Sequence, residues 1–176
     1  MIAVRHRTGW LGTYKGPMSG ENDTALREFV TTRLPQLRRS AFLMCGDWRL
    51  ATELTRATLA RLVVDSRRDA VADPDVYAYA DLMEACRRRN RRREHVFVAS
   101  PGAAGVEAES ILLLDALHKL TPRCRAVLVL RYWDGFDVDA TGAMLDLDDD
   151  RVVAYEHAGL AALEKMLGES EAALAG

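Results

Sequence analysis

Two helix breaks within one apolar segment constrain the fold of this chain more than any other feature. The segment runs from Leu117 to Leu167, and its breaks lie at Asp134-Gly135 and Asp146-Leu147. Thr121-Pro122 begins a helix, because a hydroxyl cap is followed by proline at the first helical position, and this helix is predicted to end near Trp133. Breaks of this kind divide the segment into three short helices.

The second and third helices of this segment follow from its spacing and its acidic residues. Residues 138–145 predict a short helix, since small and apolar side chains recur there three and four residues apart. Asp148, Asp149 and Asp150 then supply a cap and an acidic first turn that suit the dipole of the last helix. Its buried stripe is expected to contain Val152, Leu160, Leu163 and Leu167. Three helices in this order form a helix-turn-helix, a motif whose last helix enters the major groove of DNA.

The charge of this segment opposes DNA binding. From residue 134 to residue 176 the chain has eleven acidic residues and two basic ones, Arg151 and Lys165, which gives a net charge of −9. A helix that binds DNA needs basic or amide side chains, because phosphate neutralisation supplies much of the affinity. The candidate DNA-facing residues that remain are Arg151, Tyr155 and His157. The acids have a second interpretation as helix caps and a solvated face, and both interpretations stay open.

Composition limits the class of protein. A chain of 176 residues that is 49% hydrophobic and 7% aromatic can bury one or two modest helical cores. Its three cysteines, Cys45, Cys86 and Cys124, form no CxxC pair, which favours a reduced cytoplasmic protein over a disulfide framework or a zinc site. Residues 1–23 contain no long apolar run, so we interpret them as a flexible N-terminal tail and expect no membrane partner.

Residues 24–95 predict a first domain of three helices. The first helix begins at Thr24, bends near Pro35 and ends at Cys45-Gly46-Asp47, which also caps the second helix. Asp73-Pro74 opens the third helix. The second helix is expected to bury Leu50, Leu54, Ala57 and Leu62 and to expose Arg49, Glu53, Arg56 and Arg61. The third helix is expected to bury Val76, Tyr79, Met83 and Cys86.

A run of arginines ends the third helix. These residues complement the helix dipole and are also candidates for binding nucleic acid or another polyanion. They are Arg87, Arg88, Arg89, Arg91, Arg92 and Arg93.

The composition changes after the arginine run. Residues 96–106 are a short apolar stretch followed by small residues, which indicates a linker. The second domain is therefore placed at residues 107–168 and a C-terminal tail at residues 169–176.

Several short motifs follow one another in a specific order along residues 26–167. They are Phe29-Val30, Leu37-Arg38-Arg39-Ser40-Ala41-Phe42-Leu43, Gly46-Asp47, Ala51 with Leu54 and Leu59, Asp73-Pro74 with Tyr77-Ala78-Tyr79, the arginine run, and Leu120-Thr121-Pro122-Arg123 through Arg131-Tyr132. In their order and separation they resemble the two-domain sigma factors of bacterial RNA polymerase, the extracytoplasmic-function group, in its actinobacterial form. The resemblance implies an all-α fold, with a three-helix domain like sigma region 2 and a helix-turn-helix domain like sigma region 4.

The resemblance also implies partners and roles. In that family the second helix docks on core polymerase, the third opens promoter DNA, and the last reads the upstream promoter element. The polymerase-binding candidates of this chain are Arg49, Glu53, Leu54 and Arg56, although the neighbouring Thr52 and Thr55 alter the usual carboxyl-amide pattern. An anti-sigma or other regulatory protein is a further possible partner.

Several positions that the resemblance places against DNA depart from the family pattern. Ala80-Asp81-Leu82-Met83-Glu84 stands where the third helix commonly has arginine and asparagine, and it puts two carboxylates near the strand-opening face. In the last helix Val153 and Ala154 replace lysine and serine, and later arginines are replaced by Ala158, Ala162 and Glu164. Losing four or five phosphate contacts at on the order of 1 kcal/mol each would lower DNA affinity by several powers of ten.

We therefore expect a sigma-like transcription regulator that binds core polymerase and reads promoter DNA weakly. The alternative is a sigma-like module that binds a protein or a ligand and no longer binds DNA. Opposite charges on the two domains would either hold them together in a compact, salt-sensitive chain or attract an oppositely charged partner. We expect no enzyme, metal or cofactor, because the four histidines are dispersed and the acidic run lacks the glycine and glutamate of a calcium loop. His118 is expected on the exposed side of a helix over residues 111–120.

Overall fold

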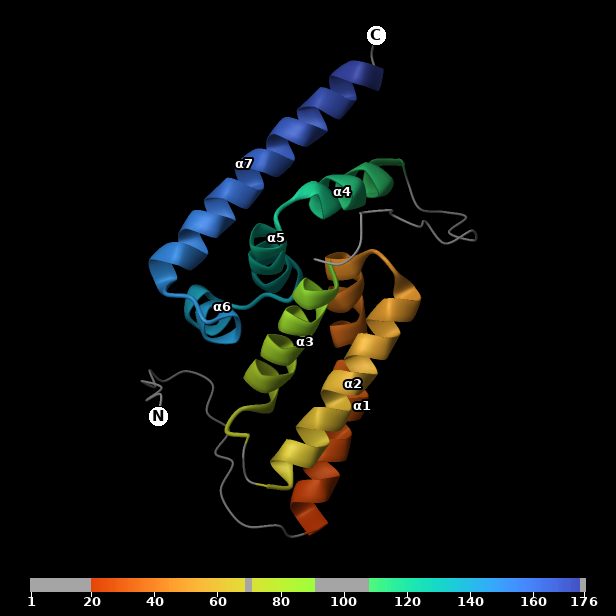
Figure 1. Ribbon diagram of the computed structural model, residues 1–176, viewed down its shortest axis with the longest axis vertical. Helices are drawn as coiled ribbons and strands as arrows, with labels where there is room; N and C mark the ends of the chain where they lie inside the picture. The colour runs from red at the N-terminus through yellow and green to blue at the C-terminus, as the bar shows by residue number, and fades with distance from the viewer. Residues whose placement is uncertain (1–19, 69–70, 91–107, 175–176) are drawn as a thin grey trace.

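The protein is all-α in the part of the chain that its computed structural model describes, residues 20–68, 71–90 and 108–174. The helices are α1 (Gly20–Cys45), α2 (Trp48–Ser66), α3 (Pro74–Asn90), α4 (Ala108–Lys119), α5 (Pro122–Leu128), a π-helical turn η1 (Val129–Trp133), α6 (Val138–Leu145) and α7 (Asp149–Leu174). Figure 1 shows α1–α3 in one lobe and α4–α7 in another. The predicted fold class is thus confirmed.

Local capping groups set the helix boundaries of the first lobe. α1 ends at Gly46, whose φ of +71° lies in the left-handed region that glycine adopts without strain. Asp47 then caps α2, because its Oδ1 accepts hydrogen bonds from the amides of Arg49 at 2.8 Å and Leu50 at 3.0 Å. Asp73 caps α3 in the same way. All three boundaries match the predicted ones.

α1 is longer than predicted. It begins at Gly20 rather than Thr24, and it continues through Pro35 as one helix. The three helices of the first lobe pack pairwise against one another. Their fully buried side chains include Leu37, Met44, Leu62, Tyr79 and Leu82.

One residue predicted to be buried in α2 is exposed. Ala57 faces solvent, whereas the adjacent Thr58 is fully buried. The hydroxyl of Thr58 donates to Asp81 of α3, so a polar contact between the helices helps to decide which side of α2 faces inward. Apolar periodicity alone ranks alanine above threonine as a core residue, and the prediction was wrong for that reason.

The second lobe contains the predicted helix-turn-helix. Thr121 caps α5, and Gly135 follows η1 with a φ of +78°. Asp146 ends α6 with a φ of +54° in the left-handed region. The turn to α7 is tight, because Leu147 N donates to Gly142 O at 3.0 Å and a Cβ added to Gly142 would lie 2.7 Å from Leu147 O.

α7 differs from the prediction in its buried face and in its length. Val152 is fully buried as predicted, but Leu160 is 39% exposed. The side facing α5 passes through Gly159, where an added Cβ would lie 3.0 Å from Leu128. This close approach brings the helix axes together at a glycine and turns Leu160 outward. α7 also continues to Leu174, so the predicted C-terminal tail begins within a helix.

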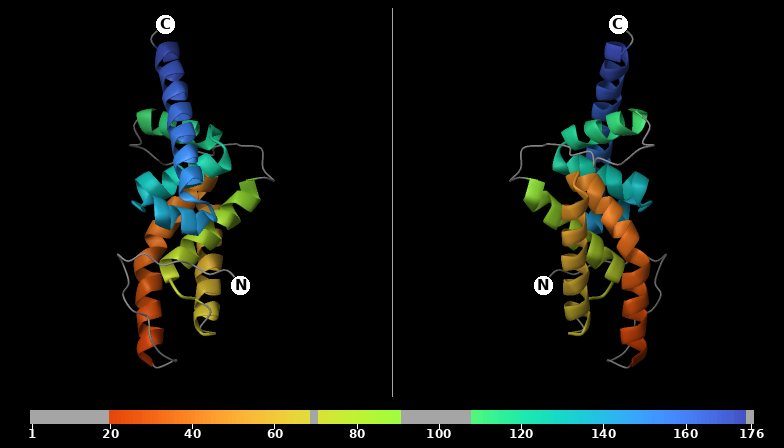
Figure 2. Two further views of the ribbon diagram at one scale, coloured as in Figure 1. Left: turned by 90° about the vertical axis from the view of Figure 1, so that its left-hand side faces the viewer. Right: turned by 90° about the vertical axis from the view of Figure 1, so that its right-hand side faces the viewer.

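The two lobes share one hydrophobic core. Buried side chains from every element except α7 belong to a single cluster, and partly buried side chains of α7 pack against it. The views in Figures 1 and 2 place the second lobe over one end of the first, with α6 packed against α3. The predicted linker at residues 96–106 lies outside the described residues. None of the helices described is both long and apolar enough to cross a membrane.

Candidate functional site

Three of the four polymerase-binding candidates form one exposed side of α2. Arg49, Glu53 and Arg56 are exposed and lie four and three residues apart, which places them on the same side of the helix. Leu54 is only 9% exposed and belongs to the core. Its assignment as a partner-contacting residue is therefore replaced by a packing role. The α2 face, as we call it, consists of Arg49, Glu53 and Arg56.

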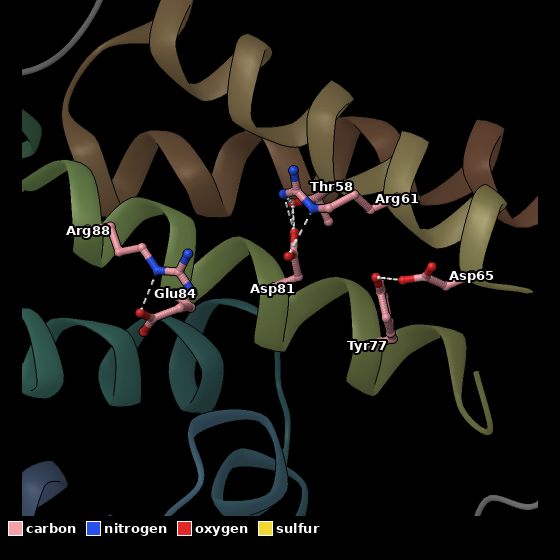
Figure 3. Close-up of polar contacts among 7 residues, drawn as sticks. All are labelled: Thr58, Arg61, Asp65, Tyr77, Asp81, Glu84 and Arg88. Carbon is pink, nitrogen blue, oxygen red and sulfur yellow. Dashed lines mark hydrogen bonds and ion pairs between the residues drawn. The ribbon is translucent and has the colours of Figure 1, made fainter. Parts of the chain in front are cut away.

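Asp81 is the first of the two carboxylates in the segment Ala80–Glu84 of α3, and it points toward α2. Arg61 Nη2 donates to Asp81 Oδ2 at 2.6 Å, Arg61 Nε donates to Asp81 Oδ1 at 3.1 Å, and the hydroxyl of Thr58 donates as well (Figure 3). The hydrogen bond with Asp81 raises the pKa of Arg61, although burial acts in the opposite direction. Asp81 is thus neutralised between two helices, and the expectation that it opposes a phosphate backbone is corrected.

A second polar contact joins α2 to α3. Tyr77 donates its hydroxyl hydrogen to Asp65 Oδ2 at 2.5 Å (Figure 3). Burial and the neighbouring carboxylate of Asp65 together raise the pKa of Tyr77 to about 12. The tyrosine therefore stays protonated and keeps donating throughout the physiological pH range.

The arginine run is partly neutralised within its own helix. Arg87 Nε and Arg88 Nε each donate to Glu84 at 2.8 Å, and Figure 3 shows the contact with Arg88. The hydrogen bond from Arg88 lowers the pKa of Glu84, although burial opposes the shift. Arg89 is exposed. The other members of the run, Arg91, Arg92 and Arg93, lie outside the described residues.

The candidate DNA-facing residues of α7 differ in exposure. Arg151 and His157 are exposed, whereas Tyr155 is half-buried and packs against the core. Val153 and Ala154 are exposed between them. The start of α7 therefore presents one arginine beside the exposed acids Asp149 and Asp150. Binding to a phosphate backbone instead requires several cationic groups.

Two acidic residues of the helix-turn-helix lobe cap its helices. Asp137 caps α6 by accepting a hydrogen bond from the amide of Ala140 at 2.8 Å, and Asp148 caps α7 by accepting one from the amide of Arg151 at 2.8 Å. The exposed acids near the turn of the helix-turn-helix are Asp139, Asp146, Asp149 and Asp150. The capping interpretation is thus confirmed for Asp137 and Asp148. The effect of the exposed acids on DNA binding stays a prediction.

Glu156 of α7 is also a structural residue. It accepts hydrogen bonds from Tyr132 at 2.7 Å and from Arg131 Nε at 3.2 Å, and it is 9% exposed. Burial favours its neutral form, but the two hydrogen bonds and the charge of Arg131 outweigh burial and lower its pKa. This contact fixes η1 against α7 and removes one acid from the surface of the last helix.

Arg125 is a buried residue that the sequence analysis missed. It is fully buried, and it donates to Leu117 O at 2.9 Å, to Leu120 O at 3.1 Å and to His118 O, all at the end of α4. It also donates to Met44 O at 2.6 Å in the last turn of α1. Burial lowers its pKa to about 10, so it remains charged, and the negative ends of two helix dipoles face it. The signal in the sequence is an arginine inside the apolar stretch after Pro122.

Asp134 is the second residue whose position was not foreseen. It was treated only as part of a helix break, but its Oδ1 accepts hydrogen bonds from Ser40 at 2.8 Å, Tyr79 at 3.0 Å and Gln36 Nε2 at 3.3 Å. Its three partners all belong to the first lobe. Burial raises the pKa of Asp134 to about 6, against the effect of these hydrogen bonds and of Arg33.

His118 is buried rather than exposed. It is 6% exposed, its Nδ1 lies 2.7 Å from Leu114 O, and its ring lies against Gly46 at the α1–α2 corner. The prediction was wrong because the end of α4 packs on the other lobe. Within the described residues no three His, Cys, Asp or Glu side chains are grouped as metal ligands would be.

An apolar groove runs between the lobes. Its volume is about 590 Å³, and Phe42 and Trp48 of the first lobe and Leu113, Trp133 and Leu160 of the second lie along it. The rings of Phe42 and Trp48 stack with centroids 4.1 Å apart. Trp48, Leu113 and Trp133 are 39%, 47% and 53% exposed, an unusual exposure for such large apolar side chains when they are grouped.

Comparisons with known proteins agree with this architecture. Residues 116–165 match the family Sigma-70, region 4. The chain is similar to the RNA polymerase sigma-E factors of Streptomyces avermitilis and Streptomyces coelicolor. Each is 31% identical to it over 151 residues, which cover 80% of this chain and 83% and 84% of the respective relatives.

A solved structure has the same fold. It is the sigma factor RpoE in complex with the anti-sigma factor NepR from Bartonella quintana. The TM-score is 0.63, and the match covers 82% of this chain and 98% of that chain. The sequences are 18% identical, so this likeness concerns the fold alone.

Proposed function

Because this chain belongs to the extracytoplasmic-function group of RNA polymerase sigma factors, we propose that it binds core polymerase through the α2 face and reads promoter DNA weakly. It is a transcription regulator and not an enzyme. The observation that carries the proposal is a contrast between two surfaces. The α2 face carries two arginines, whereas the start of α7 exposes one arginine beside the carboxylates of Asp149 and Asp150.

The α2 face suits a protein partner. Two arginines flank one glutamate, and the mixed charge favours a specific partner over a polyanion. The side chains project from a rigid helix that the Asp47 cap and the polar contacts with α3 hold in place. A preorganised surface of this kind loses little conformational entropy on binding.

Weak promoter reading follows from the two helices assigned to DNA. On α7 only Arg151 and His157 among the candidates are well exposed. On α3, the segment from Ala80 to Glu84 meets promoter DNA in this proposal, and its carboxylates are held by arginines. The segment is thus less repulsive than its composition indicates, but it provides no cationic group of its own.

The polymerase half of the proposal is tested by charge reversal. Arg56→Glu should weaken binding to core polymerase by about tenfold, because one reversed contact at an interface costs on the order of 1–2 kcal/mol. Lys165→Glu, an equal reversal at an exposed position of α7, is the matched control and should bind like the wild type. Equal binding by both variants, or no binding of the folded wild type at low salt, would contradict the proposal.

The groove between the lobes supports a second candidate function. We propose that it receives an apolar helix of an anti-sigma protein. Exposed tryptophans at its two sides supply anchors of the type that dominates helix-in-groove binding. Arg38, whose guanidinium lies 5.4 Å from the ring of Trp48, adds a positive charge at the rim that favours an acidic flank on the helix.

The groove assignment is tested with the anti-sigma proteins of the host, one at a time. Trp133→Ala should weaken binding of the cognate protein by on the order of 2 kcal/mol, the size of an interface hot spot. Val64→Ala, at an exposed position of α2 outside the groove, is the control. If both variants bind the cognate protein as tightly as the wild type does, the groove is not its binding site.

A further inference from the structure

The apolar groove between the lobes gathers most of the exposed apolar surface of the molecule. Eight large apolar side chains are exposed among the described residues, and five of them line this groove. They are Trp48, Leu113, Tyr132, Trp133 and Leu160. Exposed apolar side chains are usually scattered, so a group of this size marks a binding surface. Its volume of about 590 Å³ lies within the range of about 300–1,000 Å³ that is typical of small-molecule sites.

Arg39 is the one charged residue among the described residues that line the groove. It precedes Phe42 and Leu43 by three and four residues, so the three side chains lie on the same side of α1. Arg39 is exposed and forms no ion pair or hydrogen bond with another described residue. The guanidinium of Arg38 lies 5.4 Å from the ring of Trp48 and adds a second cation nearby. The groove therefore combines apolar walls with positive charge on its α1 side.

We propose that a free fatty acid binds in this groove, with its carboxylate at Arg39 and its hydrocarbon chain along the apolar walls, and excludes the anti-sigma helix from it. The exclusion rests on the second candidate function, because the chain covers Trp48 and Trp133, the anchors assigned to that helix. The binding of the fatty acid itself goes beyond that function. It makes the groove a small-molecule site through which a sigma factor is released from its inhibitor.

The polar groups of the groove suit one anionic head group and little else. A guanidinium binds a carboxylate through two parallel hydrogen bonds, which a neutral head group cannot reproduce. The hydroxyl of Tyr132 already donates to Glu156 Oε1 at 2.7 Å, so it needs no partner from the ligand. A ligand with further polar groups would lose their hydration against the apolar walls without gaining hydrogen bonds.

The walls suit a flexible hydrocarbon chain. Phe42 and Trp48 stack with an interplanar angle of 7° and form a flat aromatic wall on the first lobe. Leu113 and Leu160 face the groove from the second lobe. Each methylene group that is buried between such walls should tighten binding about fourfold. Affinity for a fatty acid should thus increase with chain length until the groove is filled.

The full chain tests the site with dodecanoate, below the concentration at which it forms micelles. Tryptophan fluorescence is followed in a Trp10→Phe background, where the remaining tryptophans, Trp48 and Trp133, both line the groove. The signal should change saturably, and decanoate, which is two methylene groups shorter, should bind about tenfold more weakly.

The head group is tested with two substitutions that remove the same charge. Arg39→Gln should weaken dodecanoate binding by about three- to tenfold, the size expected for one partly solvated ion pair with hydrogen bonds. Arg68→Gln, at an exposed position beyond the far end of α2, is the matched control and should not change it. Dodecanol has the same chain without the charge and should bind the wild type and Arg39→Gln equally.

Three results would overturn the fatty-acid site. They are the absence of saturable binding, an equal effect of the two arginine substitutions, and a loss of dodecanol binding in Arg39→Gln as large as that of dodecanoate. Vesicles of phosphatidylglycerol distinguish a membrane surface from a free ligand. Binding to the vesicles without binding to monomeric dodecanoate would also overturn the proposal.

A competition experiment tests the exclusion. Dodecanoate should displace an anti-sigma protein whose binding Trp133→Ala weakens, and decanoate should require about a tenfold higher concentration. Simultaneous binding of dodecanoate and that protein overturns the exclusion. If Trp133→Ala changes the binding of no anti-sigma protein, the second candidate function fails instead, and the fluorescence titration still decides the fatty-acid site.

Discussion

Asp134 Oδ1 lies 2.8 Å from Ser40 Oγ, so a carboxylate of the helix-turn-helix lobe accepts a hydrogen bond from α1 of the other lobe. Its second oxygen is buried and has no hydrogen-bond partner among the described residues. A carboxylate in this position is stabilised at one oxygen and desolvated at the other. The balance explains why its pKa rises even though it accepts three hydrogen bonds.

The first prediction concerns the pH dependence that Asp134 creates. Burial raises its pKa to about 6, above the value of about 3.9 in an unfolded chain. The proton is thus bound more tightly in the native state, and the stabilisation is fully present below pH 4 and lost as the pH rises through 6. Relative to Asp134→Asn, the wild type should lose up to about 2–3 kcal/mol between pH 4 and pH 8.

Urea unfolding of both proteins at several pH values checks this sign. Arg33, which pairs with Asp75 at 2.9 Å, and Tyr79 are the other ionisable groups near Asp134, and both proteins retain them. The difference between the two curves therefore reports Asp134. A difference that stays constant from pH 5 to pH 8 would show that Asp134 does not titrate in this range.

The second prediction concerns Arg125. Arg125→Ala should lower the free energy of unfolding by about 3–5 kcal/mol, because it leaves buried carbonyls without donors and opens a cavity. Arg123→Ala, two residues before Arg125 in the same helix, should cost less than about 1 kcal/mol. Chemical denaturation of both variants measures the two values. Similar costs for the two substitutions would contradict the role of Arg125 as the donor shared by α1 and α4.

The sequence was informative where structure is decided locally. The caps at Asp47, Thr121 and Asp148 depend on side chains within three residues of the amides they bind, and all lie where the sequence placed them. The helix-turn-helix was predictable for the same reason, since Gly135 and Asp146 interrupt an apolar pattern that is otherwise continuous.

The sequence was not informative where a second element decides the outcome. Ala57, His118 and Leu160 were each assigned to the wrong environment, because contacts with another helix determine their exposure. In the part of the chain that the structure describes, the lobes pack together through the buried groups around Asp134 and Arg125. Two arginines of the basic run bind a glutamate of their own helix.

The third prediction compares two glycines. Gly142→Ala should destabilise the protein by about 1–3 kcal/mol, because its Cβ would meet the backbone oxygen of Leu147 at 2.7 Å and the turn cannot yield easily. Gly168→Ala should stabilise it by about 0.5–1 kcal/mol, since that helical position has open space around it. Thermal unfolding distinguishes the signs. A loss of stability at Gly168 equal to that at Gly142 would contradict the tight turn.

The last prediction concerns the exposed start of α7. Val153→Lys adds a cation at a position that is 37% exposed and close to Arg151 in the helix, so it should raise affinity for promoter DNA by about three- to tenfold and steepen its salt dependence by about one ion. Val64→Lys adds the same charge at an exposed position of α2 and should change affinity less. Fluorescence anisotropy with promoter duplexes at several salt concentrations measures both effects. If the wild type already binds one duplex selectively at nanomolar concentration and physiological salt, or if Val64→Lys strengthens binding as much as Val153→Lys, the missing charge on α7 is not what limits promoter reading.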